Sequence, residues 1–154
     1  MYQKILVPLD GSQLAECALP HVIGMSKDGA AGEVILLSVV NVYIPGHSDF
    51  PTPININEIR DSLFMESKKY LDDVESRLAS EGIKVTKVSL EGSRPADIIS
   101  DYARKNGIDM IVIATHGRSG VKKLMFGSVA LRILHDSHVP VLLIRPESHQ
   151  LESH

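Results

Sequence analysis

Residues 5–12 read Ile-Leu-Val-Pro-Leu-Asp-Gly-Ser, and this stretch contains the two signals that decide the fold. Its first five residues form a short apolar run, which predicts a buried β-strand. Asp10, Gly11 and Ser12 follow directly as a turn and helix-start signal. A buried strand that leads straight into a helix is typical of an α/β protein.

The strand and helix patterns alternate along the whole chain. Apolar residues recur at three- and four-residue steps from Ser12 until residues 29–32, which predicts a first helix with a kink or an open turn at Pro20. Residues 34–40 are apolar on both faces, as in a central strand, whereas residues 83–90 alternate imperfectly, as in an edge strand. Further strands are expected at 110–114 and 140–144, and further helices at 58–82, at 95–106 and after a cap at Ser128.

This order predicts an α/β fold with a single open, parallel five-stranded sheet and helices on both faces. Ligands bind to such sheets beyond the carboxyl ends of the strands, where the strand order reverses. The loops at residues 10–12, 39–41 and 115–128 are therefore expected to border a site. We expect one domain over residues 1–146, followed by a polar C-terminal tail at 147–154.

The overall composition argues against several classes of partner. Sixteen basic and nineteen acidic residues give a formal net charge of −3, and the densest basic stretch is the pair Lys122-Lys123, so no nucleic-acid partner is expected. No apolar run approaches the roughly 20 residues of a membrane span, and no signal peptide precedes the first strand. We therefore expect a cytoplasmic protein without a membrane partner.

The cysteine and histidine residues suggest no metal or redox site. Cys17 is the single cysteine and falls on the apolar side of the first helix, which favours a small buried residue. The seven histidines are scattered without metal-ligand spacing. His135 and His138 are the nearest pair and are interpreted as solvated residues at a helix end.

Residues 114–128 contain a glycine-bearing loop between a strand and a helix. The glycines at 117, 120 and 127 allow backbone N–H groups to approach an anion, while the helix N-terminus and the Ser128 hydroxyl add favourable donors. Neither GxxxxGK[ST] nor GxGxxG occurs, which excludes the Walker loop and the dinucleotide fingerprint. The spacing alone is equally compatible with phosphate binding and with glycines that only form tight turns.

Three stretches together resemble the universal stress protein family. They are ILVPLDGS at 5–12, THGRSG at 115–120 with Gly127-Ser128 after it, and VPVLLIRP at 139–146. ATP-binding members of that family carry G-x-x-G, nine residues, then G-[S/T/N], and this chain differs only in having Ala114 as the first position. A methyl group is tolerable there because Ala114 is expected to end a strand with negative φ. The resemblance implies a Rossmann-like fold of the adenine nucleotide alpha hydrolase type.

The resemblance also implies a set of roles in ATP binding, with Mg or Mn on the phosphates. Asp10 would contact the ribose or adenine, Pro8 and Leu9 would shape the pocket, and the Val39 backbone would meet the adenine edge. The strand-four loop would contribute Ala114, Thr115, His116, Gly117, Arg118, Gly127, Ser128 and Val129, with the phosphates held mainly by the last three and by Gly117 and Arg118.

Each of these residues also has a plainer interpretation. Asp10 can be a turn residue, Val39 a core residue and Arg118 a solvated loop charge. His116 is interpreted as a loop-packing residue rather than a catalytic one, because no nucleophile, base and orienting group are readable around it.

Three functions follow from this sequence. The preferred one is a stress-response regulatory protein that binds ATP on the glycine loop. The second is a slow ATP hydrolase or phosphotransferase using His116 and Arg118, although no Walker-type lysine or carboxylate pair is visible. The third is a homodimeric interaction module that binds no nucleotide and pairs through its fifth strand, whose apolar residues 139–144 would be a liability if left exposed.

Overall fold

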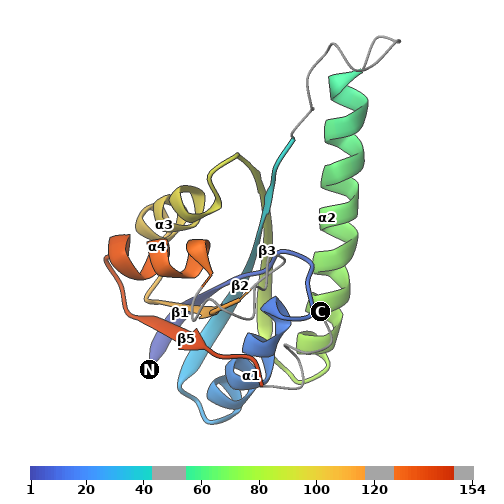
Figure 1. The fold of residues 1–154 in the computed structure, drawn as a ribbon. Helices are drawn as coiled ribbons and strands as arrows, with labels where there is room; N and C mark the ends of the chain where they lie inside the picture. The colour runs from blue at the N-terminus through green and yellow to red at the C-terminus, as the bar shows by residue number, and fades with distance from the viewer. Residues whose placement is uncertain (43–54, 117–126, 148–154) are drawn as a thin grey trace.

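The computed structural model describes residues 1–42, 55–116 and 127–147. The elements in chain order are β1 (Tyr2–Pro8), η1 (Ala15–Ala18), α1 (Leu19–Lys27), β2 (Ala31–Val40), α2 (Ile56–Ala79), β3 (Lys84–Glu91), α3 (Pro95–Lys105), β4 (Met110–Ala114), α4 (Ser128–Asp136) and β5 (Val141–Ile144). The strands form a five-stranded sheet in the order β3-β2-β1-β4-β5, and all paired strands are parallel (Figure 1). The α/β fold expected from the alternating pattern is confirmed.

Helices cover both faces of the sheet, which explains the continuous apolar runs in the strands. The elements η1, α1 and α2 cover one face of the sheet, and α3 and α4 cover the other (Figure 1). Ile5 and Val7 of β1 belong to the core on the first face, and Leu6 belongs to the core on the second. All three side chains are fully buried. Because a parallel strand between two helix layers buries successive side chains on opposite faces, every position must be apolar.

The strand order refines two expectations about the sheet. β3 lies at an edge, as its imperfect alternation predicted. β2 is an interior strand between β1 and β3, but the central strand is β1. The sequence pattern distinguishes strands that are covered on both faces from edge strands, but it does not tell which covered strand lies in the middle of the sheet.

Two local expectations about the first helix have different outcomes. The break at Pro20 is confirmed, since the segment divides into η1 and α1 and the proline occupies the first turn of α1, where its missing N–H costs nothing. The expectation that Gly32 helps to end the helix is wrong, because Gly32 lies inside β2. A Cβ at Gly32 would lie 2.7 Å from the Gln3 carbonyl oxygen, so this position needs glycine for a close approach of two strands.

Cys17 is a residue of η1 and is buried in the core, as its apolar neighbours predicted. Its Sγ lies 3.9 Å from the carbonyl oxygen of Ile144 in β5. Burial raises the pKa of the Cys17 thiol to about 11, so the thiol is protonated at neutral pH and acts as a packing residue. As for membranes, every helix within the described ranges is too short or too polar to cross a bilayer.

Candidate functional site

A cavity of about 280 Å³ opens at the carboxyl ends of β1 and β4. The chain order reverses between these two strands, because β1 continues to β2 on one side while β4 continues to β5 on the other. Parallel α/β sheets bind ligands at this kind of switch point. The cavity is lined by Pro8, Leu9, Asp10, Ala15, Leu37, Val39, Pro95, Ile99, Ile113, Ala114, Thr115, His116, Gly127, Ser128, Val129 and Ala130.

Every expected site residue within the described ranges lines this cavity. They come from the end of β1, from β2, from the end of β4 and from the start of α4, and they are Pro8, Leu9, Asp10, Val39, Ala114, Thr115, His116, Gly127, Ser128 and Val129. Gly117 and Arg118 lie outside the described residues. That these residues bind a nucleotide stays a prediction.

The remaining lining residues were missed at the level of sequence. Leu37 lies two positions before Val39 on β2, so the period of a strand could have placed both on the same face. Pro95 and Ile99 come from the first turns of α3 and carry no ligand-binding signature of their own. Only the packing of α3 against the sheet brings them to the cavity.

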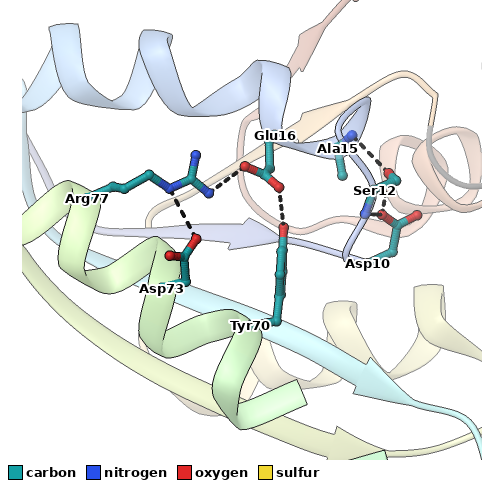
Figure 2. Close-up of polar contacts among 7 residues, drawn as sticks. All are labelled: Asp10, Ser12, Ala15, Glu16, Tyr70, Asp73 and Arg77. Carbon is teal, nitrogen blue, oxygen red and sulfur yellow. Dashed lines mark hydrogen bonds and ion pairs between the residues drawn. The ribbon is translucent and has the colours of Figure 1, made fainter. Parts of the chain in front are cut away.

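Asp10 holds the turn that leaves β1. Its Oδ1 accepts hydrogen bonds from the Ser12 N–H at 2.9 Å and from the Ser12 hydroxyl at 2.5 Å (Figure 2). The Ser12 Oγ in turn accepts the N–H of Ala15, the first residue of η1, at 3.1 Å. Gly11 completes the turn with a φ of 85°, a conformation that favours glycine. The turn role and the cavity-lining role of Asp10 therefore coexist.

The two residues after β4 are buried polar groups at the wall of the cavity. Thr115 and His116 are both buried, and the Thr115 Oγ1 lies 2.8 Å from the His116 Nδ1. The Thr115 N–H donates to the carbonyl of Ile144 at 2.8 Å, which extends the pairing of β4 with β5. The packing interpretation of His116 accounts for this geometry.

The N-terminus of α4 also faces the cavity, and its N-cap differs from the expected residue. Ser128 was expected to cap the helix, but the N-cap is Gly127 and Ser128 is the first helical residue. The Gly127 N–H donates to the Thr115 carbonyl, which joins the start of α4 to the end of β4. The N–H groups of the first turn have no partner within a helix and carry its positive dipole end, so this edge of the cavity suits an anion.

Replacing Gly127 with alanine is expected to destabilise the fold by about 1–2 kcal/mol. The added Cβ would lie 3.0 Å from the backbone carbonyl oxygen of Thr115, which cannot move without disturbing β4. Urea unfolding measures the effect. Gly24→Ala in α1 is the control, because a Cβ there meets nothing within 4 Å, and it should be neutral or stabilise by up to about 1 kcal/mol. Equal effects of the two substitutions would contradict this account.

The backbone of Val39 is directed toward the cavity side of β2. Residues along a parallel strand present their N–H and C=O groups to alternate neighbours. The Leu37 carbonyl accepts the N–H of Leu9 at 2.9 Å, so Leu37 faces β1. Val39 lies two residues further on and presents its backbone to the same side, at the level where the chain of β1 has turned away. A flat ligand could form strand-like hydrogen bonds there.

Among the described residues, no three His, Cys, Asp or Glu side chains gather in a way that could hold a metal ion. The oxygen donors that line the cavity are Asp10, Thr115 and Ser128. Mg²⁺ commonly binds through one or two protein oxygens together with phosphates and water. These donors fit a cation brought with a phosphate, and do not make a self-contained protein site.

Relatives of this chain match it over most of its length. Universal stress protein MJ0531 of Methanocaldococcus jannaschii is 33% identical over 145 residues, which cover 94% of this chain and 83% of that protein. The solved structure of MJ0577, a universal stress protein of the same organism, is 32% identical with a TM-score of 0.81, covering 96% of this chain and 99% of that chain.

A more distant structure shares the fold alone. A universal stress protein family protein of Arabidopsis thaliana, solved with AMP bound, has a TM-score of 0.69 at 16% identity, covering 96% of this chain and 94% of that chain. The Rossmann-like α/β architecture is thus common to this chain, to MJ0577 and to the Arabidopsis protein. The model of the universal stress protein family matches residues 1–145, and with the relatives above it shows that this chain belongs to that family.

Proposed function

We propose that this chain is a regulatory protein of the stress response that binds ATP in the cavity at the ends of β1 and β4. One observation carries the proposal. The largely apolar cavity at the switch point of the sheet is bordered by a carboxylate, by the backbone of an interior strand and by the N-terminus of α4. These are the three kinds of group that would suit ribose, adenine and phosphate.

The apolar walls and the Val39 backbone would hold the adenine. Leu37, Ile99 and Ile113 supply the aliphatic surface on which a flat base packs. The N–H and C=O of Val39 would then meet the polar edge of the base, which requires a donor and an acceptor side by side. Asp10 would accept hydrogen bonds from the ribose hydroxyls, since each oxygen of a carboxylate can accept more than one.

The phosphates would lie at the start of α4. Gly127 brings its backbone close without a side chain in the way, and the Ser128 hydroxyl and the first-turn N–H groups are donors. Gly117 and Arg118 are expected to complete this cradle from the loop outside the described residues. Mg or Mn would be carried on the phosphates, with the Ser128 hydroxyl as one protein oxygen that could bind the cation.

The relatives support an adenine nucleotide over other ligands. The Arabidopsis protein of the same fold was solved with AMP bound, which means that this architecture accommodates the adenosine part of ATP in at least one member. The extra phosphates of ATP require anion-binding groups beyond that part, and the glycine-bearing segment that ends at Gly127 is proposed to supply them.

The test is a binding measurement on the purified full-length chain. Calorimetric titration with ATP is expected to show saturable binding of one nucleotide per chain, with GTP as the matched control that differs only in the base. Mass spectrometry of any ligand released by denaturing the protein would identify a nucleotide retained from the cell. If neither method detects an adenine nucleotide, the proposed function is wrong.

A homodimer through β5 is proposed as the assembly in which this site operates. In the described part of the chain β5 pairs with β4 alone, and its residues Val141, Leu142 and Leu143 are only partly buried. Leu131 and Leu134 of the preceding α4 are 53% and 46% exposed. An edge strand of this kind can pair with a second copy across a two-fold axis. A monomer mass by light scattering at all protein concentrations would contradict the dimer.

A further inference from the structure

Glu16 is the centre of a polar cluster that joins η1 to α2. Its Oε2 accepts a hydrogen bond from the Tyr70 hydroxyl at 3.0 Å, and its Oε1 pairs with the Arg77 guanidinium at 2.5 Å (Figure 2). Arg77 also lies 3.6 Å from the carboxylate of Asp73, one turn earlier on α2. We call these four residues the Glu16 cluster. It lies outside the cavity, since none of its members is a lining residue.

Hydrogen bonds between Asp10 and Ser12 and between Ser12 and Ala15, followed by the peptide bond from Ala15 to Glu16, connect the wall of the cavity to the Glu16 cluster. Asp10 accepts from Ser12, and Ser12 accepts from the backbone of Ala15, which is the residue directly before Glu16. Figure 2 shows the Asp10 turn and the Glu16 cluster at the two ends of this short path. The position of the Asp10 carboxylate therefore depends on where η1 is held.

The residues Ala15, Cys17 and Ala18 of η1 are buried in the core, but the hydrogen bonding of η1 itself is weak. It is a four-residue 3₁₀-helix whose N-cap, Leu14, provides no side-chain hydrogen bond. Short 3₁₀ turns have poor hydrogen-bond geometry and are seldom stable alone. The side chain of Glu16 is 19% exposed, whereas that of Arg77 is 51% exposed, so the carboxylate is the more enclosed partner of the pair. The Glu16 cluster adds hydrogen-bonded contacts to α2 to the apolar packing of η1 in the core.

The electrostatics agree with this arrangement. Burial, and then the charge and hydrogen bond of Glu16, raise the pKa of Tyr70, and the charge of Asp10 adds to the effect. Tyr70 is therefore a neutral hydroxyl donor at physiological pH. The hydrogen bond to Glu16 raises the pKa of Arg77 as well. A half-exposed ion pair contributes little to global stability, because solvent screens it, so a role in local positioning explains the cluster better than a role in folding.

We propose that Glu16, held by Tyr70 and Arg77, is a positioning residue that sets the Asp10 carboxylate for the ribose hydroxyls of the bound nucleotide. This inference rests on the proposed function and goes beyond it, because it assigns a role in ligand affinity to residues of α2 and η1 that do not touch the ligand. It makes α2 part of the binding apparatus, although the helix packs on the outside of the sheet.

The test compares two ligands that differ only in the groups Asp10 would contact. Glu16→Gln and Tyr70→Phe are expected to weaken the binding of ATP by about three- to tenfold, as for other hydrogen-bonded neighbours of a binding group. The binding of 2′,3′-dideoxy-ATP should stay unchanged, because it has no ribose hydroxyls for Asp10 to hold. In an Asp10→Ala background, Glu16→Gln should have no further effect on ATP.

Glu91→Gln is the matched control. The Glu91 carboxylate on β3 accepts hydrogen bonds from the Nε of Arg60 on α2, at 3.1 and 3.2 Å. Glu91 is not a lining residue of the cavity, so this change should leave the affinity for both ligands unaltered. Equal losses for ATP and dideoxy-ATP would assign the cluster a general structural role and overturn the inference. Unchanged ATP binding in both variants would also overturn it. A wild-type chain that binds neither ligand would instead refute the proposed function itself.

Discussion

Leu71→Ala is expected to lower the free energy of unfolding by about 3 kcal/mol. Leu71 lies on the inner face of α2, is only 1% exposed, and packs in the core cluster between α2 and the sheet. Truncation removes apolar surface from the core and leaves a cavity that rigid neighbours fill only in part. The measurement is the midpoint of urea unfolding, with the slope of the transition checked for constancy.

Met65→Ala is the control for this change. Met65 lies on the same helix but is 72% exposed, and leucine, methionine and alanine are all good helix formers. The substitution should change stability by less than about 0.5 kcal/mol. If the two variants unfolded at the same urea concentration, the assignment of the inner face of α2 would be wrong.

Asp10→Ala is expected to weaken ATP binding by about 10- to 100-fold. Hydrogen bonds to a charged group contribute about 1.5–3 kcal/mol each, and the carboxylate is proposed to hold the ribose hydroxyls. The alanine variant also loses the acceptor for Ser12, so the turn after β1 loosens at the same time. Titration calorimetry with ATP measures the affinity, and thermal unfolding without nucleotide measures the effect on the turn.

Asp10→Asn separates the two effects. An asparagine side chain can accept the Ser12 N–H and keep the turn, but it brings no negative charge to the ribose. Its stability should therefore be close to that of the wild type, while its affinity for ATP lies between those of the wild type and the alanine variant. An asparagine variant that bound ATP as weakly as Asp10→Ala while remaining fully stable would show that the charge alone matters.

The sequence predicted those features that depend on neighbouring residues. Residues 5–9 and 110–114 are apolar at every position, and such runs occur where a strand is covered on both faces, so these two covered strands were identifiable. The turn at Asp10 and the start of α3 at Pro95 also depend on local backbone preferences. The cavity-lining residues on the loops followed from these strand ends together with the family resemblance.

Only the tertiary structure decided which distant residues meet. Tyr70 and Glu16 are 54 positions apart, and no local pattern distinguishes this tyrosine from one that simply covers a helix face. Gly32 was interpreted as part of a helix end because the contact that requires a glycine there is not visible in the sequence. That contact is the close approach of the Gln3 carbonyl on the neighbouring strand.

The sequence by itself determined the alternation of strands and helices, because hydrophobic periodicity and turn residues act over a few neighbouring positions. The tertiary structure decided that β1 is the central strand, that Pro95 and Ile99 of α3 reach the cavity, and that the Asp10 turn is tied to α2 through Glu16. These three features depend on strand order and on packing between elements far apart in the chain. Such contacts cannot be recognised from the residues that neighbour each position in the sequence.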